Sequence, residues 1–151
     1  MLKIPQRLLG EALLISAGNF PSKTAIIVKS KEYTYFELKE SAEKLANYLA
    51  ISGVKKGDRV AIYMNNSWHN VVSIYGITLA GAVFLVINPQ TKADKLSYIL
   101  NDSGAKALIS ESGLNHELTS ALKDSNTVLN LIIAGENQDI QTPEKIKFSG
   151  F

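Results

Sequence analysis

Apolar positions along this chain follow two patterns that alternate with each other. Continuous apolar runs of about five residues are typical of buried strands, whereas apolar residues three and four positions apart are typical of helices. Because helical stretches separate the apolar runs, the strands are expected to run parallel, with helices on both faces of the sheet. The pattern predicts an α/β fold. The predicted strands are Thr24–Lys29, Arg59–Met64, Val83–Ile87, Ala105–Ser110 and Val128–Gly135.

The helix expected after Thr34 has clear boundaries. Thr34 and Glu37 have the spacing of a capping box, in which each side chain meets the other residue's backbone N–H. Gly53 is the expected terminator, because glycine adopts positive φ without a Cβ clash. The apolar face between them consists of Leu38, Ala42, Leu45 and Leu49.

A second helix is expected from Trp68 to about Ala80, with Ser67 as its N-cap. This stretch is apolar nearly all round, so it needs cover on more than one side. We expect the sheet to cover only one side, which predicts an exposed apolar patch on the helix in this chain alone. Two further helices are predicted, from Thr91 to Gly104 and from Leu114 to Ser125.

The N-terminal stretch resembles a signal peptide only loosely. Glu11 lies in the middle of what would be its apolar core, where a carboxylate is costly, so an amphipathic helix is the preferred interpretation. The longest apolar stretch, Ile77–Ile87, is shorter than the roughly 20 residues that a membrane span needs. We therefore expect no transmembrane segment and a cytoplasmic protein.

Composition narrows the chemistry. The 151 residues have a net charge of +2, with scattered lysines and arginines, so no nucleic-acid partner is expected. The absence of cysteine excludes disulfides, thiolate zinc sites and thiol nucleophiles. Residues 136–151 form a predicted linker and tail after an α/β unit at residues 1–135.

Three polar segments are expected at one edge of the sheet, because ligands of open parallel sheets bind beyond the carboxyl ends of the strands. The segments are Asn65–Ser67, Asn88–Pro89 and Ser110–Ser112. Backbone amides and a helix N-terminus at this edge would suit an anion. Alternatively, these residues only form turns and helix caps, which is a common role for asparagine and serine.

No motif identifies a catalytic, cofactor-binding or metal-binding residue. The sequence lacks both standard glycine-rich phosphate loops and the G-x-S-x-G nucleophile motif. His69 and His116 lie on different predicted helices without a partner at ligand spacing. Both histidines are interpreted as ordinary helix residues.

The order of four segments nevertheless resembles the adenylate-forming superfamily, which includes acyl-CoA synthetases, nonribosomal adenylation domains and luciferases. Tyr33–Leu38 is similar to its first signature and Thr78–Pro89 to its second. Gly53–Ser67 and Lys95–Ser110 are similar to the segments that follow each of them. The branch that the chain resembles most is the acyl-CoA ligases of fatty-acid metabolism.

Two positions depart from the second signature. Leu79 stands where a lysine is usual, and Val86 stands where a proline is usual. Val86 can donate a backbone hydrogen bond that proline cannot, so the change makes strand pairing easier. The departures weaken an assignment to a particular subfamily.

The resemblance implies an N-terminal subdomain of an AMP-forming ligase that uses ATP, Mg²⁺ and CoA to convert a carboxylate into an acyl-adenylate and then an acyl-thioester. The family's phosphate loop, ribose-binding aspartate and C-terminal lysine have no counterpart in these residues. We therefore expect no bound cofactor and no activity for the chain alone. Three interpretations remain: an N-terminal fragment, one subunit of a split ligase, or a non-enzymatic binding module. The expected partner is the remainder of the ligase, or another copy contacted through exposed apolar surface.

Overall fold

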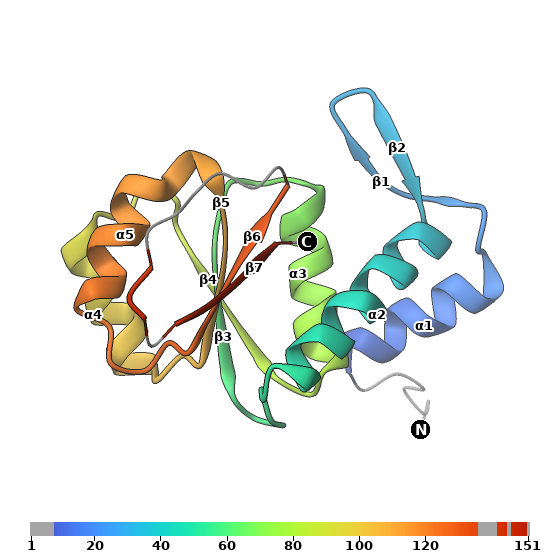
Figure 1. The fold of residues 1–151 in the computed structure, drawn as a ribbon. Coiled ribbons are helices and arrows are strands. Elements are labelled where there is room, and N and C mark those ends of the chain that lie inside the picture. The colour runs from blue at the N-terminus through green and yellow to red at the C-terminus, as the bar shows by residue number, and fades with distance from the viewer. Residues whose placement is uncertain (1–7, 136–141, 145, 151) are drawn as a thin grey trace, which may run out of the picture.

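The structure is a computed structural model that describes residues 8–135, 142–144 and 146–150. Five strands form one sheet in the order β4-β3-β5-β6-β7, and every neighbouring pair is parallel (Figure 1). The sheet strands are β3 (Arg59–Tyr63), β4 (Val83–Ile87), β5 (Ala107–Glu111), β6 (Asn130–Ala134) and β7 (Lys147–Gly150). The predicted α/β fold is confirmed.

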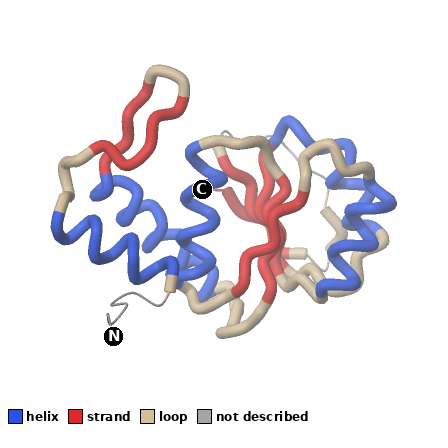
Figure 2. The backbone as a smooth tube through the Cα atoms, turned by 180° about the vertical axis from the view of Figure 1, so that it is seen from behind, coloured by secondary structure: helices blue, strands red, loops and turns tan. Residues whose placement is uncertain are grey.

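Helices cover both faces of this sheet, as Figure 2 shows from behind. On one face lie α1, α2 and α3, and on the other lie α4 and α5 (Figure 1). A parallel sheet needs this arrangement, since both of its faces are apolar. The helices are α1 (Leu9–Asn19), α2 (Tyr35–Ile51), α3 (Trp68–Leu79), α4 (Ala93–Ser103) and α5 (Asn115–Lys123), with a short 3₁₀ turn, η1, at Ser112–Leu114.

The core is divided into two apolar clusters by the sheet. Val60 and Ile62 of β3 belong to the cluster under α1–α3, whereas Ala61 and Tyr63 belong to the cluster under α4 and α5. This alternation follows from the two-residue period of a strand. All four residues are fully buried, so β3 contributes to both clusters.

The predicted strand at Thr24–Lys29 exists, but it is not part of the parallel series. Its residues form β1 (Thr24–Val28), which pairs antiparallel with β2 (Lys31–Thr34) in a separate hairpin. Only Lys29 and Ser30 connect the two strands, and Lys29 has a φ of 56°. A connection this short permits only antiparallel pairing.

The C-terminal segment was predicted to be a linker and tail, and part of that prediction is wrong. Lys147–Gly150 forms β7, which pairs parallel with β6. Residues 136–141, 145 and 151 lie outside the described residues. The strand was missed because "KFSG" is short and only partly apolar.

The predicted boundaries of α2 are confirmed. The Thr34 hydroxyl accepts a hydrogen bond from the Glu37 amide at 3.2 Å, and the Glu37 carboxylate accepts one from the Thr34 amide at 2.7 Å. At the other end, the Val54 amide donates to the Leu49 carbonyl and Gly53 has a φ of 92°. The second helix also begins as predicted, because the Ser67 hydroxyl accepts from the Asn70 amide at 3.2 Å.

The predicted apolar patch on α3 is wrong. Every residue of α3 is buried or half-buried, because α1 and α2 pack on the side that faces away from the sheet (Figure 1). The closest approach is at Gly76, where an added Cβ would lie 2.8 Å from Leu45 Cδ2 and 2.9 Å from Leu45 Cβ. The chain therefore covers α3 with its own first two helices.

We predict that Gly76→Ala destabilises the protein, because the new methyl group would overlap the buried Leu45 side chain. The expected loss is about 1–3 kcal/mol in the free energy of unfolding, measured with urea. Gly18→Ala is the matched control: Gly18 lies in α1 with open space around it, so alanine should be neutral or slightly stabilising. Equal effects of the two substitutions would contradict the packing argument.

Candidate functional site

The carboxyl ends of β3 and β5 are joined by Asn65 and Glu111. The Glu111 carboxylate accepts hydrogen bonds from the Asn65 backbone amide at 3.0 Å and from the Asn65 side-chain amide. Two of the predicted polar segments therefore do meet at this edge. However, they use their hydrogen-bonding groups on each other, and they place a carboxylate where an anion would have to bind.

The other polar residues of this edge also have structural partners. The Ser67 hydroxyl caps α3, and the Asn88 side chain accepts from the Gln90 amide at 2.9 Å in a tight turn. The Ser110 hydroxyl is buried and donates to the Tyr63 carbonyl. Of the two interpretations left open by the sequence, the structure supports turns and caps.

Tyr63 fixes the connection that follows β4. Its hydroxyl donates toward the carbonyl oxygens of Pro89, at 3.1 Å, and Thr91, at 2.8 Å. Burial raises the pKa of Tyr63, with a further contribution from the charge of Glu117. The phenol therefore stays protonated at neutral pH and serves as a donor to the loop.

Glu117 of α5 closes the same edge from the other side. Its carboxylate accepts from the Ala93 amide at 2.8 Å, at the N-terminus of α4, and lies 3.2 Å from the Lys92 ammonium. The hydrogen bond from Ala93 is the largest cause that lowers the pKa of Glu117, followed by the bond from Lys92. A carboxylate is favourable at a helix N-terminus, so this glutamate holds α4 and α5 together.

Several polar groups of this edge are thus engaged within the chain, with Glu111, Glu117 and the caps described above. Among the described residues, no group of three or more histidine or acidic side chains is arranged to hold a metal ion. The hydrogen bonds described above join the strand ends to the helices that follow them.

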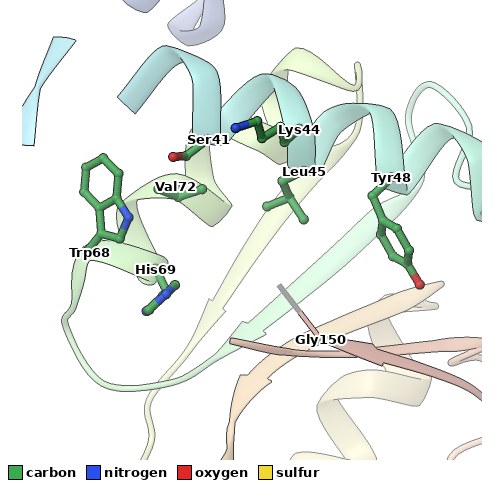
Figure 3. Close-up of a pocket in the computed structure, with 8 residues that line it drawn as sticks. All are labelled: Ser41, Lys44, Leu45, Tyr48, Trp68, His69, Val72 and Gly150. Carbon is green, nitrogen blue, oxygen red and sulfur yellow. The ribbon is translucent and has the colours of Figure 1, made fainter. Parts of the chain in front are cut away.

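A pocket of about 360 Å³ lies elsewhere, between α2, α3 and the end of β7 (Figure 3). Its floor is apolar, with Leu45 and Val72, and its polar groups stand at the margin. Burial lowers the pKa of His69, against a smaller opposing effect of Glu111, so the imidazole is neutral at pH 7. The lining residues are Ser41, Lys44, Leu45, Tyr48, Trp68, His69, Val72 and Gly150.

The two histidines are far from equivalent. His69 lines this pocket, whereas the His116 side chain is 95% exposed on α5, with Nδ1 3.8 Å from the Glu117 carboxylate. Sequence reasoning missed the pocket because its walls come from three separated segments. It also missed that Trp68 stacks on Tyr33 of the hairpin, with ring centroids 4.0 Å apart. No local pattern in the sequence indicates either feature.

The fold defines the chain as an α/β protein with a parallel sheet. Comparison with known proteins identifies its family. Residues 14–150 match the family model described as "AMP-binding enzyme". The chain therefore belongs to the AMP-binding enzyme family, as its resemblance to adenylate-forming ligases predicted. The relatives place it in the acyl-CoA ligase branch and with the N-terminal portion of that fold.

A long-chain-fatty-acid–CoA ligase of Bacillus subtilis is 37% identical over 108 residues, which are 72% of this chain and 19% of that enzyme. A solved long-chain-fatty-acid–CoA ligase from Archaeoglobus fulgidus is 31% identical, with a TM-score of 0.80 over 87% of this chain and 28% of that one. A benzoate CoA ligase from Burkholderia xenovorans is 29% identical, with a TM-score of 0.78 over 85% and 26%. The chain thus spans between about a fifth and just over a quarter of the length of these relatives.

No helix in the described part of the chain is long and apolar enough to cross a membrane. The longest, α2, has 17 residues and carries charged side chains on its outer face. This agrees with the expectation drawn from the apolar runs.

We predict that Glu117→Gln lowers stability at pH 7 and that the difference from the wild type shrinks in acid. The folded-state pKa of Glu117 is lowered from 4.5, so its carboxylate stabilises the fold above about pH 4.5 and loses that effect as the pH falls through the lowered value. Urea midpoints at pH 7 and pH 3 measure the difference. Glu40→Gln, which removes only an exposed pair with Lys44 at 3.9 Å, is the control. A gap that stays constant with pH would contradict this assignment.

Proposed function

We propose that this chain supplies the N-terminal portion of an AMP-forming acyl-activating ligase and is inactive until the remaining parts of the enzyme are present. The whole enzyme would join a carboxylic acid to the phosphate of ATP and then transfer the acyl group to the thiol of CoA. In this proposal the chain contributes scaffold, and the groups that hold ATP and Mg²⁺ come from other polypeptide. The chain alone would bind none of these cofactors.

The observation that carries this proposal is the unequal coverage of the relatives. The chain matches solved CoA ligases with TM-scores near 0.8 over most of its own length but over only about a quarter of theirs. Its carboxyl edge supports the same conclusion, because Asn65, Ser67 and Asn88 are committed to turns, caps and Glu111. Stabilising the charge that develops on a phosphoryl group requires donors aimed at it, and in this proposal those donors come from the remaining polypeptide.

The proposed substrate is a carboxylic acid, either a fatty acid or an aromatic acid. Relatives act on long-chain fatty acids or on benzoate, as their names state. A carboxylic acid activated as its CoA thioester is common to them, which gives a role in fatty-acid or aromatic-acid metabolism. A cytoplasmic location suits these water-soluble cofactors.

A split ligase is the form of the proposal in which the remaining parts come from a second polypeptide. A non-enzymatic binding module is the second candidate function. It is favoured by the closed packing of α1, α2 and α3 and by the pocket beside Trp68 and His69, which is apolar with a few polar groups. The two candidates predict different results when the remaining ligase polypeptide is added. The ligase proposal predicts that enzymatic activity appears, and the binding module predicts that it does not.

We predict that the purified chain catalyses no ATP–pyrophosphate exchange with fatty or aromatic acids. Exchange should appear when it is mixed with a polypeptide that carries the rest of the Bacillus subtilis ligase, from the end of the matched 108 residues onward. The polypeptide alone is the control for residual activity. Exchange by the chain alone would contradict the scaffold role, and no gain on mixing would favour the binding module.

We also predict no measurable ATP binding by the chain in a calorimetric titration. A helix N-terminus supplies about 1 kcal/mol, whereas millimolar affinity requires about 4 kcal/mol. Saturable binding in the micromolar range would show that the chain holds a nucleotide site of its own. The pocket variant Trp68→Ala would then show whether that site is the one between α2 and α3.

A further inference from the structure

Strand β4 forms one edge of the five-stranded sheet. Within the described residues it pairs with β3 on one side and with no strand on the other. Figure 1 shows the sheet with β7 toward the viewer, and the reversed view of Figure 2 is therefore taken from the side of β4. An open edge presents unpaired backbone donors and acceptors, to which another strand can add.

The hydrogen-bonding direction of each β4 residue follows from the register. The Val83 amide donates to the Asp58 carbonyl at 2.8 Å, and Val83 is in register with Arg59 of β3. Because backbone groups alternate in direction along a strand, Leu85 and Ile87 also bond to β3. The N–H and C=O groups of Phe84 and Val86 consequently point to the open edge.

The side chains of this edge are apolar and accessible. Phe84 and Val86 lie on the face that carries α1–α3, yet they remain 37% and 50% exposed and belong to neither core cluster. Val83, on the opposite face, is 51% exposed. Exposed apolar side chains therefore lie on β4 and not on α3, where the sequence predicted them.

Nothing in β4 opposes pairing with another strand. Edge strands are commonly protected by charged residues or proline, and Val83–Ile87 contains neither. The chain's net charge is only +2, so two copies repel each other weakly. In a twofold contact, the outward-pointing N–H and C=O groups of Phe84 and Val86 meet the same groups of the second copy. The edge is therefore complementary to itself.

We propose that two copies of this chain associate through antiparallel pairing of their β4 edges, which joins the two sheets across a twofold axis. The axis passes beside Leu85. Phe84 of one copy then faces Val86 of the other, and each such pair exchanges both of its backbone hydrogen bonds. An aromatic residue opposite a β-branched one is a favourable cross-strand pair. Both exposed side chains on the α3 face are covered by this single contact.

The proposed contact between the two strands buries little surface. A five-residue strand is about 17 Å long, and pairing at one edge buries less than the roughly 1,200 Å² of a standard stable interface. We therefore expect a weak and reversible dimer. The dimer would be visible by sedimentation at high protein concentration and absent after dilution.

The first test is Val86→Pro in the 151-residue chain. Proline removes the outward-pointing N–H, which is half of the donors in the proposed contact, and leaves the bonds to β3 intact. The strand should tolerate it, since proline is the usual residue at this position of the second signature. We expect dimerisation to weaken at least tenfold in analytical ultracentrifugation. Ile51→Lys, which changes an 88% exposed apolar residue at the end of α2, should leave dimerisation unchanged.

The second test fixes the register with cysteines, because the chain has none of its own. Leu85 would lie opposite Leu85 of the other copy in a non-hydrogen-bonded pair, with Cα atoms about 4.5 Å apart, within disulfide range. Leu85→Cys should therefore form a covalent dimer on mild oxidation. Val83→Cys should not, since its counterpart would lie about 14 Å away.

Several results would overturn the proposal. A chain that remains monomeric at every concentration, or Val86→Pro that dimerises like the wild type, excludes this edge as the interface. If Val83→Cys forms a covalent dimer and Leu85→Cys does not, the twofold register centred beside Leu85 is excluded. Circular dichroism of each variant shows whether it is folded, and if Val86→Pro is not, the two cysteine variants decide the question.

Discussion

A parallel sheet exposes two apolar faces and must be covered on both, and this constraint organises the chain. Strand β3 contributes Val60 and Ile62 to one cluster and Ala61 and Tyr63 to the other. On the first face a second layer is needed, because α3 is apolar nearly all round. The approach of α2 to α3 at Gly76, against Leu45, supplies that layer within these residues. The core is thus closed above and below the sheet but not at its edges.

The need to end strands and begin helices also accounts for the polar residues at the carboxyl edge of the sheet. The loops that leave β3, β4 and β5 are short, so their polar groups are needed to end strands and begin helices. Glu111 and Glu117 complete this network by accepting hydrogen bonds from Asn65 and from the amide of Ala93. Carboxylates in these positions stabilise the scaffold and are unsuited to binding phosphate. Solved relatives extend well beyond this part, since the chain covers only 26% and 28% of two of them.

Local patterns in the sequence predicted the helix boundaries, which depend on residues close together in the chain. The capping box at Thr34 and Glu37, the N-cap at Ser67 and the terminator at Gly53 were all confirmed, because each involves residues a few positions apart. The hairpin at Thr24 and strand β7 were assigned wrongly, since pairing partners are chosen by the tertiary fold. The pocket beside His69 was not predicted at all. Its walls come from α2, α3 and β7, which no sequence window contains together.

The apolar patch predicted for α3 was wrong because local sequence does not show how helices pack on each other. The prediction placed exposed apolar surface on α3 because that segment is apolar nearly all round. In the fold, a helix can be covered by other helices packed from any side, whereas an edge strand can be completed only by another strand. The exposed apolar side chains are therefore Phe84 and Val86 of β4, whose outward backbone groups pair with no other strand among the described residues. Apolar side chains and unpaired backbone groups coincide on this edge, whereas Ile51 is an isolated exposed residue at the end of a helix, and it is this coincidence that supports the proposed strand pairing.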